Sequence, residues 1–232
     1  ARTWLDPELV RAFVRLAETS RFWAQLESTA VDIRVASMAP EDAEEVDDDH
    51  LDAIAAAFGK VIDAKSPYTA GHSVRVADYA ERLGERLGVL PTRRRRLRRA
   101  ATLHDVGKLG VSSAILEKPG KLDDAEWAAM RTHASHTQAI LGRIGALADL
   151  APIAASHHER LDGTGYPLGL DATVLSRETR IITLCDVYDA LTAERPYRAA
   201  MPVERALAVM ADEVGRALDP EGFEALTAMV GG

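Results

Sequence analysis

The chain has 232 residues, a formal net charge of −8, 47% hydrophobic residues and only 5% aromatic residues. This length suits one substantial domain with an additional element, and the prevalence of Ala, Leu, Arg and Glu favours helices over sheets. The acidic balance argues against a general nucleic-acid-binding protein, and no apolar run approaches the roughly 18 residues of a membrane span.

The first part of the chain is predicted to be a helical extension. Residues 1–36 carry apolar side chains at helical spacing, and Asp6-Pro7 is a plausible helix start. The acidic run that follows is expected to be a linker. We therefore expect two regions, namely an N-terminal helical extension with its acidic linker over 1–49 and the main domain over 50–232.

The main domain is predicted to be a bundle of helices. Helical patterns are expected over the ranges 51–64, 72–83, 91–104, 123–141, 150–159, 178–192, 202–217 and 220–230. Two segments, 107–122 and 162–169, are rich in Gly and Pro and are expected to be loops. No segment has a convincing strand pattern, so the sequence predicts an all-α fold.

Six arginines crowd the predicted helix that leads to His104: Arg93, Arg94, Arg95, Arg96, Arg98 and Arg99. No helix breaker separates them from His104, so we expect them to form the solvated face of that helix. Binding of an anionic partner or a lipid is the alternative interpretation of the run.

The most informative feature is the pair His104-Asp105, followed by Lys108. An adjacent imidazole and carboxylate can hold a divalent metal ion, and the lysine can contact a phosphate. Further candidate ligands are spread along the predicted helices: His72, His133, His136, His157, His158 and Asp186. Ligands on separate helices can converge in the core of a bundle. Asp105 is the natural bridge between two ions, because each of its oxygens can take one.

Two pairs of candidate residues each share one face of a predicted helix. His133 and His136 are three residues apart and share a helical face, so spacing alone does not choose between them as ligands. Asp186 and Asp189 share a face of a helix that is apolar nearly all round, and buried unpaired carboxylates are costly, so they should bind metal or cations.

The single cysteine, Cys185, is expected to be a core residue; it excludes an internal disulfide and fits a reducing cytoplasm.

These residues together predict a metal-dependent phosphohydrolase. Two neighbouring ions would activate a water molecule and stabilise an in-line displacement at phosphorus. Asp105 and Lys108 are the expected catalytic residues. Arg195 and Arg198 could fork onto phosphate oxygens, or could simply form a surface turn after the preceding helix.

With these motifs, the chain resembles the HD-GYP family, a branch of the HD phosphohydrolase superfamily, over roughly residues 50–230. The motifs that carry the resemblance are, in chain order, Asp63-Ala-Lys-Ser-Pro-Tyr-Thr-Ala-Gly-His-Ser73, His104-Asp-Val-Gly-Lys108, Lys118-Pro-Gly-Lys-Leu122, His157-His-Glu-Arg-Leu-Asp-Gly-Thr-Gly-Tyr-Pro167, and Asp186-Val-Tyr-Asp-Ala-Leu-Thr192 leading to Arg195-Pro-Tyr-Arg198. The resemblance implies an HD-type helical bundle with an N-terminal extension. It also implies hydrolysis of cyclic di-GMP to linear pGpG, and in many members on to GMP.

The resemblance further implies a role for each site residue. The implied metal ligands are His72, His104, Asp105, His133, His157, His158 and Asp186, with Asp105 as the bridge. The resemblance places Lys108 at the phosphate and Arg195 and Arg198 at the substrate. The Gly165-Tyr166-Pro167 loop would line the site or contact a diguanylate cyclase (GGDEF) partner. Two divalent ions are expected, iron or manganese first, with zinc, magnesium or nickel as other candidates.

The chain departs from the family pattern at three positions. Some members hold a third ion through a glutamate one turn before the first histidine, where this chain has Tyr68, so two ions are expected. Ala134 and Thr137 replace the usual Pro and Gly after His133 and could alter the local helix packing.

The sequence is also compatible with two other functions. One is a dimetal phosphohydrolase of another cyclic dinucleotide or nucleotide, and the other is a regulatory domain that binds cyclic di-GMP or a partner with little turnover. An upstream sensory domain and a homodimer are further expectations for the full-length protein. No nucleic-acid partner and no membrane span are expected for this chain.

Overall fold

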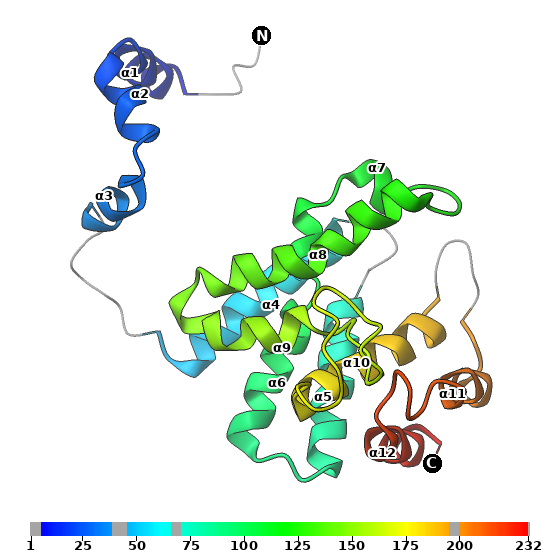
Figure 1. Ribbon diagram of the computed structural model, residues 1–232. Coiled ribbons are helices and arrows are strands. Elements are labelled where there is room, and N and C mark those ends of the chain that lie inside the picture. Colours follow the sequence, from blue (N-terminus) through cyan, green and yellow to red (C-terminus); the bar gives the residue numbers. More distant parts are fainter. Residues whose placement is uncertain (1–5, 39–45, 66–70, 195–199, 232) are drawn as a thin grey trace. The chain divides into compact units, whose positions relative to one another are not determined.

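The computed structural model describes residues 6–38, 46–65, 71–194 and 200–231, and the regular structure in these ranges is helical (Figure 1). No strand occurs in the described ranges, where β-type pairing is limited to isolated bridges such as that between Asp162 and Asp171. The predicted all-α fold is therefore confirmed. The chain divides into two compact units, Ala1–Val46 and Asp47–Gly232, which are described in turn.

The first unit contains the short helices α1 (Pro7–Ala17), α2 (Ser20–Leu26) and α3 (Val31–Ser37). The Asp6 carboxylate caps α1 by accepting a backbone hydrogen bond from the first turn at 2.7 Å. The sequence pattern indicates helix throughout 1–36, but hydroxyl side chains form turns between the three helices. Thr19 donates to the Leu16 carbonyl at 2.7 Å, and Ser28 accepts a backbone N–H at 3.2 Å. Such local bonds compete with the helical backbone bonds.

The second unit contains the remaining elements: α4 (Asp48–Ala64), α5 (His72–Arg86), α6 (Pro91–Leu103), η1 (Val106–Gly110), α7 (Ser113–Leu116), α8 (Asp124–Gly142), η2 (Gly145–Leu150), α9 (Ala151–Ala155), α10 (Arg177–Thr192), α11 (Val203–Ala211) and α12 (Pro220–Val230). α5 and α6 form a helical hairpin, and α10 packs against α5 (Figure 1). α8 packs along η1 and α9. These contacts define the bundle that holds the candidate site.

Several helices of the second unit end earlier than the sequence pattern indicates. The helix expected over 150–159 ends at Ala155, because the imidazole of the next histidine occupies the Ala154 carbonyl that a further helical N–H would use. The helix expected over 202–217 is also shorter, and Gly215 in the turn beyond it has a φ of 79°. The Gly- and Pro-rich segment before α8 contains η1 and α7 as well as loop.

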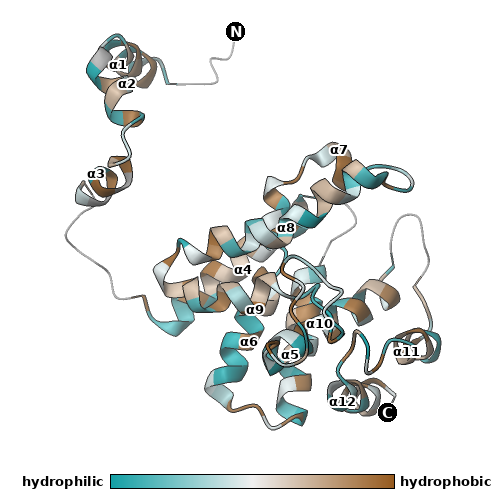
Figure 2. Cartoon of the chain, in the orientation of Figure 1, coloured by the Kyte–Doolittle hydropathy of each residue, from teal (hydrophilic) through white to brown (hydrophobic). Residues whose placement is uncertain are grey.

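The core of the second unit is built mainly from small and aliphatic side chains. Its buried apolar cluster draws on α5, α6, α9 and α10, and includes Ala80, Ala100 and Ala101. Small residues let the helices approach closely: a Cβ on Gly84 of α5 would lie 3.0 Å from the Leu97 side chain of α6. Figure 2 shows that α6 is hydrophilic along most of its length, which reflects its arginines.

The arginines of α6 are paired with acidic residues of the same unit. The pairs are Arg93–Glu178, Arg94–Glu85, Arg95 with Asp49 and Asp52, Arg96–Asp149, Arg98 with Asp78 and Glu81, and Arg99 with Asp48 and Asp52. Arg99 is only 4% exposed, so the expectation of a solvated face is wrong for this residue. Its burial is tolerated because two carboxylates of α4 neutralise its charge.

Candidate metal centre

The structure brings the predicted metal ligands together from separate elements of the second unit. His72 is the first residue of α5, His104 follows α6, Asp105 precedes η1, His133 lies in α8, His157 and His158 follow α9, and Asp186 lies in α10. Gly71 has a left-handed φ of 68°, which lets α5 begin directly at His72. Residues far apart in the sequence thus share one buried location.

Asp105 lies at the middle of this cluster, and its two carboxylate oxygens face different histidines. Oδ1 is 3.6 Å from the Nε2 atom of His133 and 3.8 Å from that of His157. Oδ2 is 3.5 Å from the Nε2 atom of His104 and 3.7 Å from that of His72. The carboxylate therefore has the placement that a bridge between two ions requires.

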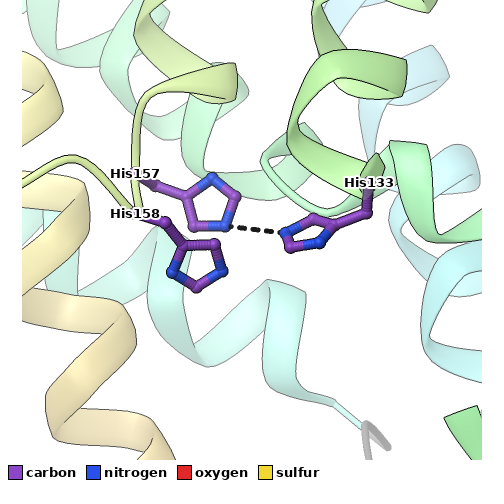
Figure 3. A group of neighbouring side chains, drawn as sticks. All are labelled: His133, His157 and His158. Carbon is purple, nitrogen blue, oxygen red and sulfur yellow. Dashed lines mark hydrogen bonds between the residues drawn. The ribbon is translucent and has the colours of Figure 1, made fainter. Parts of the chain in front are cut away.

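The donor atoms form two groups on either side of this carboxylate. The first group is His133, His157 and His158, and the second is His72, His104 and Asp186; within each group the donor atoms lie within 4.8 Å of one another. Figure 3 shows the first group, with the ring of His133 facing the two consecutive histidines. The Nε2 atoms of His133 and His157 are 3.5 Å apart. Each group offers three donors in addition to one oxygen of Asp105.

Hydrogen bonds at Nδ1 fix the tautomer of four of these imidazoles. The Nδ1–H groups of His104, His133 and His157 donate to the carbonyl oxygens of Ala101, Met130 and Ala154 at 2.6–2.7 Å. His72 donates from Nδ1 to the Asp189 carboxylate at 2.7 Å. A carbonyl oxygen only accepts, so each Nδ1 carries the proton and Nε2 is left as the coordinating atom.

The donor set fits divalent metal ions. Asp105 Oδ1 is buried and has no hydrogen-bond partner among the described residues, although it faces imidazole nitrogens. An ionised oxygen in such a position is costly unless a cation is close to it. Neutral imidazoles and carboxylates are the ligands of iron, manganese and zinc. Burial, the orphaned oxygen and the converging Nε2 atoms all point to metal binding.

The electrostatics of the cluster support the same conclusion. Burial opposes ionisation of Asp105, but Lys108 and the nearby imidazoles hold the pKa of this carboxyl well below its usual value. Burial lowers the pKa values of His133 and His157, and lowers that of His158 to about 4. At neutral pH the first group is therefore a set of neutral imidazoles beside an ionised carboxylate, which is the protonation state that metal binding needs.

His72 differs from the other imidazoles. Burial lowers its pKa, but hydrogen bonds to Asp186 and Asp189 outweigh burial and raise the pKa to about 9. Asp186 in turn has a pKa below its usual value, because the bond to His72 and the charges of nearby histidines outweigh its burial. The carboxylates that face His72 therefore favour a positive charge at the second group.

Asp189 of α10 binds basic side chains, as its position in an apolar helix predicts. It is 1% exposed and accepts hydrogen bonds from His72 Nδ1 at 2.7 Å and from Arg75 Nε at 2.6 Å. Asp186, one turn earlier, faces the metal-ligand cluster instead, with Oδ1 3.4 Å from His72 Nε2. Asp186 is therefore a candidate metal ligand, and Asp189 supports the candidate ligand His72.

Thr137 has a structural role that the sequence did not indicate. Its hydroxyl donates to the His104 carbonyl at 3.0 Å and accepts the Gly107 N–H at 3.0 Å. The side chain is fully buried and ties α8, which carries His133, to the turn that carries Asp105. The departure from the family pattern at this position is compensated by two hydrogen bonds.

The remaining predicted site residues are placed as follows. Lys108 is half-buried and its Nζ atom bonds to Asp105 Oδ2 at 2.5 Å. His136 lies against Gly110, apart from the cluster that contains His133, and in the described part of the chain its buried Nδ1 atom has no hydrogen-bond partner. Tyr166, in the Gly165-Tyr166-Pro167 loop, stacks on His158 with the ring centroids 4.7 Å apart. The predicted substrate residues Arg195 and Arg198, and Tyr68, lie outside the described residues.

Comparison with known proteins identifies the family. A family model described as "HD domain" matches residues 57–222 of this chain. The chain belongs to the HD domain family. Its motifs and relatives place it in the HD-GYP branch of that family, as the sequence resemblance predicts. The shared fold accounts for the arrangement of helices around the cluster.

Relatives with curated names are phosphodiesterases. The chain is 52% identical over 224 residues to the "3'3'-cGAMP-specific phosphodiesterase 3" of Vibrio cholerae, covering 96% of this chain and 49% of the relative. It is 38% identical over 167 residues to the "Cyclic di-GMP phosphodiesterase PA4108" of Pseudomonas aeruginosa, covering 71% of this chain and 40% of the relative. The chain therefore spans about half the length of the curated relatives it matches, or less.

A solved structure supports the assignment. The crystal structure of a cyclic GMP-AMP-specific phosphodiesterase of V. cholerae aligns with a TM-score of 0.61 and 47% identity, covering all of this chain and 53% of that chain.

In the described part of this HD-GYP chain, none of the helices combines the length and apolarity that a membrane crossing requires.

Proposed function

We propose that the second unit is a two-metal phosphodiesterase of cyclic dinucleotides and that 3'3'-cGAMP is its substrate. The observation that carries the chemistry is the placement of Asp105, whose two oxygens face two separate groups of donors. The choice of substrate is supported by the V. cholerae relative that is 52% identical over 96% of this chain.

The first ion would be held by His133, His157, His158 and Asp105 Oδ1, and the second by His72, His104, Asp186 and Asp105 Oδ2. This set of imidazole nitrogens and carboxylate oxygens suits iron or manganese, and also accepts zinc or nickel. Bound divalent ions supply a hydroxide at neutral pH and neutralise charge on the phosphate. The protein supplies buried side chains, four of whose imidazole rings are held in fixed orientations by hydrogen bonds.

The residues of the chain have distinct tasks in this reaction. Asp105 remains ionised at neutral pH, because Lys108 and the imidazoles lower its pKa. The Lys108 ammonium lies at the edge of the cluster and is half-buried, so it can turn from Asp105 towards a non-bridging phosphate oxygen. Asp189 and the backbone carbonyls hold the histidine rings, so the donors need little reorganisation when substrate binds.

Cyclic di-GMP is the second candidate substrate. The sequence motifs resemble those of cyclic di-GMP phosphodiesterases, and the P. aeruginosa relative named for this activity is 38% identical over 71% of this chain. The two nucleotides differ in one base, so the same phosphodiester chemistry serves both. Discrimination between them rests on contacts to the bases rather than on the metal ligands.

A competition assay tests both the proposed phosphodiesterase activity and the proposed choice of substrate. Metal-loaded protein is given equal concentrations of 3'3'-cGAMP and cyclic di-GMP, and the linear products are separated by mass spectrometry. We expect linear products from both, with the larger kcat/KM for 3'3'-cGAMP. A preference for cyclic di-GMP would contradict the substrate assignment alone. No hydrolysis of either nucleotide, at confirmed metal occupancy, would contradict the phosphodiesterase itself.

A further inference from the structure

His158 is oriented differently from the other histidines of the cluster. His72, His104, His133 and His157 are each anchored by a hydrogen bond from Nδ1. In the described part of the chain, neither ring nitrogen of His158 has such a partner. In Figure 3 the Nε2 atoms of His133 and His157 face each other, and the dashed line between them has no counterpart at His158. An imidazole that must present a lone pair to a metal needs some other restraint on its ring plane.

The ring of Tyr166 supplies a face-on contact to His158. The two rings are nearly parallel, with an interplanar angle of 29° and centroids 4.7 Å apart. The contact of His158 with His133 is edge-on at 88°, and its contact with His157 is tilted at 46°. Offset stacking of this kind defines the orientation of a ring plane, whereas an edge contact leaves rotation about Cβ less restricted.

The loop that carries Tyr166 is folded back onto His158. The Tyr166 N–H donates to the His158 carbonyl at 3.2 Å. A Cβ on Gly165 would lie 2.5 Å from Glu159 Cα and 2.6 Å from the His158 carbonyl oxygen, so only glycine allows this approach. The buried Glu159 carboxylate accepts the N–H groups of Leu168 and Leu170 at 2.7 and 3.0 Å. The backbone therefore fixes where the Tyr166 ring can lie.

Arg131 holds the same ring from α8. Its guanidinium carbon is 5.3 Å from the centroid of Tyr166, within the range of a cation–π contact. Arg131 is exposed and has no ion pair among the described residues, so its charge is available to the ring. It lies two residues before His133. Arg131 thus links the Tyr166 loop to the helix that carries another ligand of the same group.

We propose that Tyr166, braced by Arg131, is a positioning residue that sets the ring plane of His158 for metal binding. The inference rests on the proposed metal centre and gives the loop tyrosine a task that does not involve the substrate. The aromatic ring is the part that acts, because the phenol hydroxyl has no hydrogen bond in the described residues. Loss of the ring should therefore weaken one ion site and spare the other.

Titration of the metal-free protein with Mn²⁺ alone tests this inference. Calorimetry of the wild type should resolve two ions. Tyr166→Leu should weaken one of them by about 10–100-fold, as for loss of other groups that support a metal ligand, and leave the second unchanged. Tyr166→Phe keeps the ring and should bind both ions as the wild type does.

Substitutions of Arg131 provide an independent test. Because Arg131 is exposed, we expect these substitutions to leave folding intact. Arg131→Met should weaken the same ion site as Tyr166→Leu, by a smaller factor, and Arg131→Lys should restore most of the affinity. Arg143→Met is the matched control, since Arg143 is an exposed arginine just beyond the other end of α8. It should leave both ions unaffected. Circular dichroism establishes that each variant is folded.

Two results would overturn the inference. Unchanged binding of both ions by Tyr166→Leu and Arg131→Met would show that stacking does not position His158. A loss in Tyr166→Phe as large as that in Tyr166→Leu would assign the role to the hydroxyl. Because no nucleotide is present, a wrong substrate assignment leaves the inference standing. A wild type that binds no Mn²⁺ would instead contradict the metal centre of the proposed function.

Discussion

At the scale of single residues, the site depends on buried polar groups that each serve two partners. Asp189 holds both His72 and Arg75, and Thr137 holds both the His104 carbonyl and the Gly107 N–H. Removing one such group leaves a buried partner, the Nδ1–H of His72 or the Gly107 N–H, without its hydrogen bond. The cost of an unsatisfied buried group is about 1–3 kcal/mol. Asp189 supports a candidate metal ligand, whereas Thr137 ties α8 to the turn that carries Asp105. We therefore expect a substitution of Asp189 to affect mainly metal binding and a substitution of Thr137 to affect mainly folding.

Asp189→Asn should weaken metal binding without preventing folding. Asparagine keeps the shape and one acceptor oxygen but loses the charge that supports the Nδ1–H of His72. We expect about 10–100-fold weaker affinity for one ion, measured by competition with a metal chelator. Asp149→Asn is the control, because Asp149 forms an exposed ion pair with Arg96 outside the site. Equal affinities for the two variants would contradict the role of Asp189.

Thr137→Val should destabilise the fold. Valine has nearly the same shape but leaves the His104 carbonyl and the Gly107 N–H unpaired, so we expect a loss of about 1–3 kcal/mol in the free energy of unfolding. Thr132→Val on the same helix is the control, since Thr132 is exposed. Urea denaturation of the metal-free proteins measures the difference. A similar stability of both variants would refute the tie between α8 and the Asp105 turn.

At the scale of elements, the contact of η1 with α8 sets the distance between Asp105 and His133. Gly107 makes this contact possible, because a Cβ there would lie 1.9 Å from the His133 carbonyl oxygen and 2.5 Å from the Thr137 nitrogen. Neither neighbour is a flexible side chain, so the helix itself would have to move. The glycine of the His104-Asp-Val-Gly-Lys108 motif is thus a packing requirement as well as a sequence marker.

Gly107→Ala should therefore greatly reduce the yield of folded protein, or abolish metal binding in the protein that does fold. Gly142→Ala, at the end of α8, is the matched control, because a Cβ there meets no atom within 4 Å. Alanine also has the higher helix propensity, so the control should be as stable as the wild type or more stable. Thermal unfolding and metal content distinguish the two variants. A stable Gly107→Ala protein with normal metal content would contradict the packing argument.

The sequence allowed much of this site to be anticipated, and its limits have physical causes. The His-Asp pair and the histidine doublet indicated the cluster because such residues are rarely gathered by chance. Spacing could not choose between His133 and His136, since residues three apart share a helical face and only the packing of η1 on α8 separates them. The burial of Arg99 was missed, because its carboxylate partners lie on α4, far away in the sequence.

The ends of several helices also differ from those that the sequence pattern predicts. The helix before His157 ends early because the histidine ring takes a backbone carbonyl, and His104 does the same at the end of α6. Hydrophobic periodicity carries no information about such bonds. Candidate ligands therefore follow the ends of α6 and α9, whereas the largest boundary error, in the helix expected over 202–217, lies away from any candidate ligand in the sequence.

At the scale of the whole molecule, the site and its core belong to the second unit. The buried apolar cluster begins at Ala55, and the candidate ligands span from His72 to Asp186. A chain that begins at Asp47 should therefore keep the unfolding temperature of the site-bearing unit and its metal content, as measured by calorimetry and elemental analysis. A chain that also lacks α4 should unfold readily, because Arg99 would lose Asp48 and Asp52. Loss of metal from the first truncation would contradict this division.

The central claim is that Asp105 bridges two metal ions, and the metal content per chain tests it most directly. Elemental analysis of anaerobically purified wild type should give two divalent ions per chain. Asp105→Asn, which keeps one carbonyl oxygen but replaces the other oxygen with an amide nitrogen that cannot coordinate, should retain at most one. A wild type with one ion or none, or an Asp105→Asn variant that still holds two, would contradict the claim.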